Sequence, residues 1–268
     1  MTADAARALL ARLLRQRGEL GAPPFFLKGL GRDQALRLAA RAGVAGPGEA
    51  PDAARGAAHR SAAAPPVANG ASSLVRGQPL PVLPADHEPL RVLVSGCRRC
   101  ALAEGRTQVV FHDGVPQARL MVIGEAPGKT EDETGLPFVG AAGKLLDLLL
   151  MTIDLSRKES VYICNVLKCR PPGNRNPLPD EIEACRPFLE RQIEIVAPKA
   201  ILGVGTFAAQ WLTGSQAPLG KLRGEVYSYR EVPLVVTYHP AALLRNAGWT
   251  RATWDDFQLL SQVLGRDA

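Results

Sequence analysis

Hydrophobic positions change their spacing several times along the second half of this 268-residue chain. Short, continuous apolar runs, typical of buried strands, alternate with stretches in which apolar residues recur every three or four positions, as on one face of a helix. The runs predict strands at residues 119–123, 161–165, 200–202 and 234–238. The helical spacing predicts helices at residues 141–151, 178–196, 206–212 and 249–264.

This alternation predicts an α/β fold with three layers, in which a central four-stranded parallel sheet carries helices on both faces. The ligand crevice of such a sheet lies at the carboxyl ends of its strands. Unusual segments follow all four predicted strands: Gly124-Glu-Ala-Pro-Gly128, Asn165, Gly203-Val-Gly205-Thr206 and His239-Pro-Ala-Ala-Leu-Leu-Arg245. Because they belong to the same edge of the sheet, we expect these segments to form one functional cleft.

The first 88 residues differ from the rest of the chain in composition. Residues 1–20 and 32–42 have the apolar stripe of amphipathic helices, and we expect a helical extension at residues 1–43. Residues 44–88 are rich in Ala, Pro and Gly and carry few large apolar side chains, so they cannot bury enough surface to become ordered. We therefore expect a disordered linker there and an ordered domain at residues 89–268.

The connection between the first predicted strand and the next helix is unusually long. It spans residues 124–140 and holds Glu125, Glu131 and Phe138. Loops of this length inside a compact domain are usually functional, although a purely structural loop is the alternative. The segment resembles a phosphate-binding loop, but only three residues separate its glycines and the Glu125 carboxylate would repel a phosphate. We interpret it as the wall of a pocket, not as a nucleotide site.

Charge and cysteine content indicate which partners the protein binds and in which compartment it works. A net charge of +6 and a pI near 9.3 favour a polyanionic partner such as nucleic acid, although scattered arginines would equally suit a soluble surface. We expect neither a secretory signal at the start of this sequence nor a membrane span, because no apolar run is long enough to span a membrane. Five cysteines, an odd number, indicate a reducing compartment, and we expect a cytoplasmic protein.

Four of the cysteines form a candidate metal site. Cys97 and Cys100 make a CxxC pair, and Cys169 and Cys185 follow downstream. Four thiolates suit tetrahedral zinc or an iron–sulfur cluster, and the spacing does not choose between the two. Ordinary buried thiols are the alternative. Cys164 lies inside a predicted strand, where a small apolar side chain packs well, so we expect it to belong to the core.

Taken together, the segments at the strand ends resemble a known family. They are Gly124-Glu-Ala-Pro-Gly128, Gly135-Leu-Pro-Phe-Val-Gly140, Asn165-Val-Leu-Lys-Cys-Arg-Pro-Pro-Gly-Asn174-Arg175 and His239-Pro-Ala-Ala-Leu-Leu-Arg245. This set resembles the family 4 uracil-DNA glycosylases, iron–sulfur members of the uracil glycosylase superfamily, over about residues 89–264. The resemblance implies a DNA repair enzyme that flips uracil out of DNA and hydrolyses its N-glycosidic bond, releasing free uracil and leaving an abasic site.

The resemblance also implies a [4Fe-4S] cluster and a set of site residues. The cluster ligands would be Cys97, Cys100, Cys169 and Cys185. The expected partner is uracil-containing DNA, single- or double-stranded, with no membrane contact and a monomer as the default state.

Catalytic and base-reading roles follow from the same resemblance. Phe138 would stack on the uracil ring, and Asn165 would read its edge, because one amide can donate to O4 and accept from N3–H. His239 would donate to uracil O2. Glu125 would orient the attacking water and face the cationic sugar.

Further residues match the family less specifically. Ala126, Pro127 and Glu131 would lie near the substrate, and Ala126 and Glu131 are the candidates for excluding the methyl group of thymine. Asn174 would support either the pocket wall or its own turn. Gly205 and Thr206 would receive a DNA phosphate, as would Arg245, while Leu243 or Leu244 would wedge into the base stack. Five basic residues are candidate contacts to the DNA backbone: Lys168, Arg170, Arg175, Lys221 and Arg223.

Three other hypotheses compete with a uracil-DNA glycosylase that hydrolyses the bond. A covalently trapping relative carries an inserted basic loop with a reactive histidine before the last strand, whereas residues 219–225 here contain neither an insertion nor a histidine. A glycosylase with broader specificity for deaminated bases is the second. A non-catalytic iron–sulfur module that binds DNA is the third.

Overall fold

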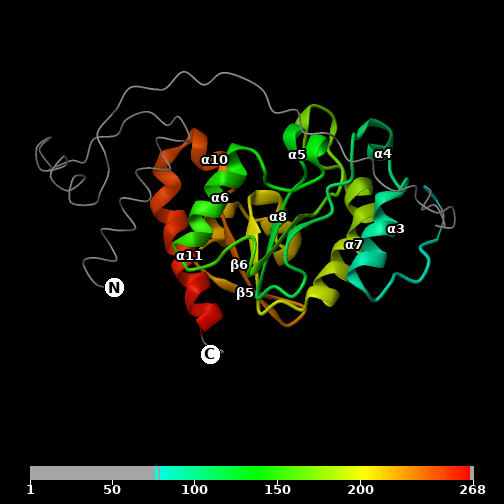
Figure 1. Ribbon diagram of the computed structural model, residues 1–268. Coiled ribbons are helices and arrows are strands. Elements are labelled where there is room, and N and C mark those ends of the chain that lie inside the picture. Colours follow the sequence, from blue (N-terminus) through cyan, green and yellow to red (C-terminus); the bar gives the residue numbers. More distant parts are fainter. Residues whose placement is uncertain (1–75, 78, 266–268) are drawn as a thin grey trace, which may run out of the picture. The chain divides into compact units, whose positions relative to one another are not determined.

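A six-stranded sheet lies at the centre of the computed structural model, which describes residues 76–77 and 79–265 (Figure 1). The sheet has the order β1-β3-β2-β4-β6-β5. Its strands are β1 (Asp113–Gly114), β2 (Leu120–Gly124), β3 (Val161–Asn165), β4 (Ala200–Val204), β5 (Val226–Tyr229) and β6 (Val232–Thr237). The expected helical extension and most of the expected linker lie outside the described residues.

The prediction of a parallel four-stranded sheet was right for the centre and wrong for the edges. Strands β3, β2, β4 and β6 are parallel neighbours, as expected, but β1 and β5 add an antiparallel strand at each edge. β1 has two residues, too few to show any period. β5 has no buried residue, and Arg230 and Glu231 connect it to β6. Both have positive φ, 47° and 69°, but lack the Asn-Gly signature of such turns.

Helices cover both faces of the sheet and confirm the three-layer architecture (Figure 1). One face carries α6 (Ala141–Met151), α10 (Pro240–Arg245) and α11 (Thr250–Gly265). The other face carries α7 (Pro179–Val196), α8 (Thr206–Thr213) and α9 (Leu219–Leu222). The strand residues alternate between the two cores: Leu120 and Val122 pack under α6, whereas Met121 and Ile123 pack under α7.

A third apolar cluster lies beside this sandwich. There α3 (His87–Ser95) lies against α7, followed by α4 (Leu102–Gly105) (Figure 1). Leu90, Val94 and Phe188 pack around Cys169 and Cys185. Leu80 and Leu83 pack against the same cluster, ahead of α3.

The sequence predicted that the long connection after β2 is a loop without regular structure, and this prediction was wrong in part. The connection contains the short helix α5 (Lys129–Thr134), whose residues are all polar and therefore show no hydrophobic period. Two further short helices, η1 (Pro172–Asn174) and η2 (Ala247–Trp249), complete the elements that border the carboxyl edge. In the described part of the chain, no helix combines the length and apolar character needed to cross a membrane.

Candidate active site

A pocket of about 720 Å³ opens at the carboxyl edge of the sheet. Its size is within the usual range for small-ligand sites. Its walls include Glu125, Asn165, Gly205 and His239, which follow or close the four parallel strands. Seven other residues expected at the site also line it: Ala126, Pro127, Glu131, Phe138, Asn174, Thr206 and Arg245. The parallel register brings these segments together, because Gly124 pairs with Asn165 and Val204 pairs with Thr237.

Asn165 presents an unsatisfied polar group to this pocket. The residue is 2% exposed, and its Oδ1 atom is buried without a hydrogen-bond partner among the described residues. Such groups are rare in folded proteins, because an unpaired buried acceptor costs about 1–3 kcal/mol. The atom is therefore available to a ligand that brings an N–H group.

Gly124 makes room for this arrangement. A Cβ atom at Gly124 would overlap Asn165 Oδ1 and lie 2.6 Å from Cζ of Phe138. A side chain at that position would push the amide and the ring apart. The glycine is thus required by close approach, with the amide and the phenyl ring on the same wall of the pocket.

Phe138 is held in an unusual backbone conformation. Its φ is +54°, in the left-handed region that a bulky side chain rarely adopts. Its ring packs on the His239 ring, with centroids 5.4 Å apart and planes 26° apart. Gly143, in the first turn of α6, permits the approach, because a Cβ atom there would overlap the Phe138 carbonyl.

Arg157 fixes that backbone, and it was not among the site residues predicted from the sequence. Its Nη2 donates to the Phe138 carbonyl at 2.7 Å, and its Nη1 donates to the Pro137 carbonyl at 2.9 Å. The same guanidinium pairs with Asp113 at 2.9 Å and with Asp147 at 2.8 Å. No local signal identifies Arg157, because its partners lie 10 to 44 residues away along the chain.

His239 is set up as a neutral hydrogen-bond donor. Its Nδ1 accepts from the Ala241 N–H at 3.1 Å at the start of α10, so the ring proton belongs on Nε2. Burial lowers the pKa of His239 to about 4, and the positive charge of Arg245 contributes in the same direction. The imidazole is therefore uncharged at neutral pH.

The two glutamates of the pocket differ in their surroundings. Burial raises the pKa of Glu125, which follows β2. Glu131 instead accepts from the N–H groups of Val139 at 3.0 Å and Gly140 at 3.1 Å. Glu131 thus ties α5 to the segment after Phe138, whereas the Glu125 side chain lines the pocket.

Residues expected to contact DNA fall into distinct environments. Leu243 is buried in the core under α6, whereas its neighbour Leu244 is 55% exposed. Of the two expected wedges, only Leu244 is accessible. Asn174 lines the pocket wall, and it also accepts at Oδ1 from Arg170 Nε at 2.7 Å within its own turn.

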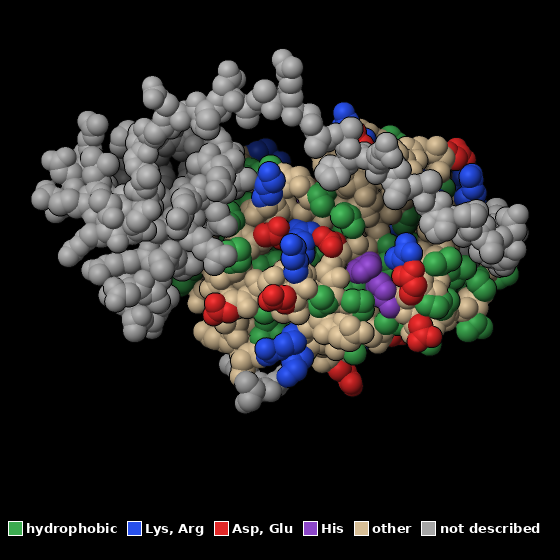
Figure 2. Space-filling view, in the orientation of Figure 1, with side chains coloured by type: hydrophobic (Ala, Val, Ile, Leu, Met, Phe, Trp, Pro, Cys, Tyr) green, Lys and Arg blue, Asp and Glu red, His purple; other side chains and the backbone are tan. Residues whose placement is uncertain are grey.

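Two of the five basic residues expected to contact the DNA backbone are instead paired inside the protein. Lys168 is 1% exposed, and its Nζ donates to the Asn165 backbone carbonyl at 2.7 Å. Arg223 is ion-paired with buried Asp256 at 2.7 Å. On the face in Figure 2, basic and acidic side chains are interspersed, so the positive net charge is not concentrated in one patch there.

Two aromatic residues of the pocket were also missed. Tyr238 and Trp249 line it, and their rings stack with centroids 4.6 Å apart and planes 9° apart. Arg223 lies over the Tyr238 ring at 4.5 Å. Both aromatic residues lie at the ends of predicted elements, and no sequence pattern links the two positions.

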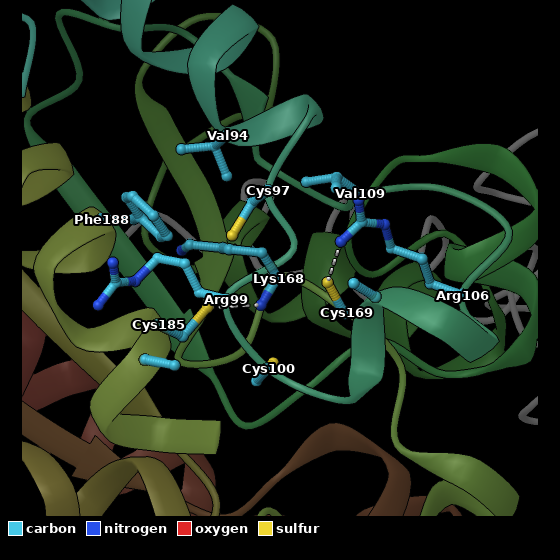
Figure 3. Close-up of a pocket in the computed structure, with 12 residues that line it drawn as sticks. Val94, Cys97, Arg99, Cys100, Arg106, Val109, Lys168, Cys169, Cys185 and Phe188 are labelled. Carbon is cyan, nitrogen blue, oxygen red and sulfur yellow. Dashed lines mark hydrogen bonds between the residues drawn. The ribbon is translucent and has the colours of Figure 1, made fainter. Parts of the chain in front are cut away.

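The four candidate ligand cysteines surround a second pocket, beside α3 and α7 (Figure 3). Arg106 Nη1 donates to Cys169 Sγ at 3.2 Å, and the Lys168 N–H donates to Cys185 Sγ at 3.4 Å. Burial raises the pKa of Cys169 to about 11 and that of Cys185 to about 12. Among the described residues, no group of three or more His, Cys, Asp or Glu side chains is arranged to hold one metal ion.

The fifth cysteine has a different environment. Cys164 is fully buried in β3 and packs in the core under α7, as predicted. It does not line the pocket that the other four cysteines share.

Comparison with known proteins identifies the family to which this chain belongs. The sequence is 41% identical over 184 residues to the Type-4 uracil-DNA glycosylase of Sulfurisphaera tokodaii, covering 66% of this chain and 84% of that relative. It is 44% identical over 169 residues to the Type-4 uracil-DNA glycosylase of Pyrobaculum aerophilum, covering 60% of this chain and 86% of that relative. It is 45% identical over 155 residues to the Type-4 uracil-DNA glycosylase of Thermotoga maritima, covering 57% of this chain and 80% of that relative. The profile of the uracil DNA glycosylase superfamily matches residues 111–258. The chain belongs to the uracil DNA glycosylase superfamily, and its pocket lies within the matched region.

Proposed function

We infer that this protein excises uracil from DNA by hydrolysing the N-glycosidic bond, which leaves free uracil and an abasic site. Its relatives at 40–45% identity are named Type-4 uracil-DNA glycosylases. The observation that carries the inference is the buried Oδ1 of Asn165, which has no hydrogen-bond partner within residues 76–265 as far as the structure describes them, beside the stacked rings of Phe138 and His239.

Uracil fits this group of side chains chemically. Its N3–H would satisfy the Asn165 oxygen, while the amide N–H₂ would donate to O4. Cytosine presents the opposite pattern of donors and acceptors, so with the amide in this orientation it would leave both amide groups unpaired. A site built around such hydrogen bonds can discriminate by about 10⁴-fold or more. Phe138 would support the face of the extruded base.

His239 and Glu125 would stabilise the charges that develop as the N-glycosidic bond breaks. Negative charge on departing uracil would be stabilised by the Nε2–H of His239, whose proton position follows from the bond to Ala241. One fixed donor of this kind contributes about 10²- to 10³-fold. The Glu125 carboxylate would face the cationic sugar and orient water, and general-base help contributes about 10²- to 10⁴-fold.

The remaining expected residues take supporting roles. Glu131 would position the Phe138 segment through its two backbone hydrogen bonds. Ala126 and Pro127 would form the wall that excludes the methyl group of thymine. Arg245, Thr206 and exposed Leu244 would contact the DNA around the extruded nucleotide.

The four-cysteine pocket fits a [4Fe-4S] cluster as the protein's resident group. In such a cluster each thiolate binds a different iron, so the four sulfurs need not converge on one point, in keeping with their arrangement around a pocket. Donors from Arg106 and the Lys168 backbone would stabilise the thiolates of Cys169 and Cys185. The cluster would act structurally, cross-linking the α3–α4 segment to α7 and to the segment after β3.

The test uses an oligonucleotide with one uracil, followed by alkali. We expect free uracil and strand cleavage at the uracil position, and no cleavage when cytosine or thymine replaces uracil. An Asn165→Ala variant should lose most of this activity. A DNA adduct that survives SDS would indicate covalent trapping, and cleavage at hypoxanthine would indicate broader specificity. Binding without an alkali-labile site would leave only a DNA-binding module.

A further inference from the structure

One aromatic ring of the pocket wall has no role in the reaction described above. Trp249 ends η2, lines the pocket and is 38% exposed. Tryptophan is enriched at binding interfaces relative to the rest of a protein's surface, because it is large and rigid and has a polar N–H group. The question is therefore what this indole binds.

The indole is held in place from behind. Tyr238 stacks on it at 4.6 Å with almost parallel planes, and Tyr238 also contacts the Arg223 guanidinium at 4.5 Å. Arg223 is fixed by Asp256, which in turn accepts from Thr237 at 2.5 Å. A ring already ordered in this way loses little freedom on binding, which favours its use as a rigid stacking surface.

The second exposed tryptophan provides a contrast. Trp254 is 41% exposed on α11, and Arg251 lies over its ring at 5.2 Å. It does not line the pocket. Trp249 differs from it in lying on the pocket wall and in the aromatic ring behind it.

We propose that Trp249 stacks on the nucleobase next to the extruded uracil, so that this chain binds a flanking base as well as the uracil. The proposal rests on the proposed function. Extruding a uracil removes the stacking partner of its neighbour, whose exposed face then needs a new one. Aromatic side chains stack on any base, and Arg245, which lines the same pocket, supplies a positive charge for the adjoining phosphate.

The test pairs the side chain with the base in a double-mutant cycle. Single-stranded oligonucleotides carry one uracil with both neighbours intact, or with the 5′ or the 3′ neighbour replaced by a baseless tetrahydrofuran. The enzymes are wild type, Trp249→Ala, Trp249→Phe and the control Trp254→Ala. Each is measured for kcat/KM, and thermal unfolding monitors folding.

We expect loss of one neighbour to lower the wild-type kcat/KM by about 5- to 100-fold, the range of one base–aromatic stack. Trp249→Ala should lose a similar factor on the intact oligonucleotide and nothing further when that neighbour is removed. Trp249→Phe should retain most of the wild-type sensitivity, and Trp254→Ala should behave as wild type.

Two results overturn the stacking proposal alone. One is wild-type activity that is insensitive to both neighbours. The other is an equal loss in wild type and in the folded Trp249→Ala and Trp249→Phe variants when a neighbour is removed. Absence of uracil release by the wild type from the intact oligonucleotide would instead overturn the proposed function, and this proposal with it.

Discussion

Arg157 Nη2 donates to the backbone carbonyl of Phe138 at 2.7 Å, across 19 residues of sequence. The Arg157 side chain is 14% exposed, and its guanidinium is itself held by Asp113 and Asp147. A left-handed phenylalanine costs about 1–3 kcal/mol, and such a conformation persists only where its surroundings impose it. Arg157 supplies part of that constraint.

Replacing Arg157 should therefore impair base stacking through Phe138. Because a displacement of about 1 Å can cost about 10²-fold, we expect Arg157→Met to lower kcat/KM on a uracil oligonucleotide by about 10- to 100-fold. In a Phe138→Leu background the same change should have little further effect, as residues acting through one contact are not additive. Arg157→Lys should restore part of the loss.

The control is Arg230→Met, because Arg230 forms its ion pairs with Glu190 and Glu194 on α7, away from the pocket. It should remain close to wild type in activity. Additive losses for Arg157→Met and Phe138→Leu would show that Arg157 acts on stability or elsewhere in the site.

Glu125→Gln should keep measurable activity. The amide retains the shape of the side chain but loses its charge and its basicity, so we expect kcat to fall by about 10²- to 10⁴-fold. Single-turnover excision at saturating enzyme separates this loss from DNA binding. If the variant turns over uracil at the wild-type rate, Glu125 takes no part in the reaction.

The Glu131 carboxylate should behave differently from that of Glu125. Glu131→Ala leaves the Val139 and Gly140 N–H groups without their present acceptor, at about 1–3 kcal/mol for each group that stays buried. We expect a lower melting temperature together with a higher KM. Glu131→Gln, which keeps one acceptor oxygen, should be closer to wild type, and equal stability of the Ala variant would contradict this account.

His239 should make stability depend on pH in a defined window. Its pKa is about 4 in the folded protein and about 6.5 when unfolded. Between these values the unfolded chain binds more protons, so stability is lost as the pH falls from about 6.5 to about 4. His112, whose pKa burial also lowers to about 4, contributes in the same direction.

The measurement compares wild type with His239→Gln by chemical denaturation at several pH values. The difference between their unfolding free energies should shift in favour of the variant as the pH drops through this window. A difference that stays constant from pH 7.5 to pH 4 would mean that His239 is not buried in its neutral form.

The cysteine pocket makes a prediction for the purified protein. We expect a brown protein with about four iron atoms and four sulfides per chain. Cys97→Ala and Cys185→Ala should lose iron, whereas Cys164→Ala should retain it, because Cys164 belongs to the core. One zinc and no iron in anaerobically prepared protein would contradict the cluster assignment.

Much of the fold was predictable because its parallel strands and long helices have regular hydrophobic periods. Helix α6 has the predicted bounds, and α7, α8 and α11 agree with prediction to within one residue at each end. The edge strand β5 escaped prediction because half of its residues face solvent, and α5 because it has no apolar residue.

The sequence by itself determined which residues end the parallel strands, and hence that Glu125, Asn165 and His239 meet at one edge. Strand direction and chain order suffice for that conclusion. Only the tertiary structure decided that Leu244 and not Leu243 is exposed, that Lys168 is buried, and that Arg157 and Trp249 support the pocket. These facts depend on contacts between segments far apart in the chain, and such contacts have no period or motif that a linear pattern can carry.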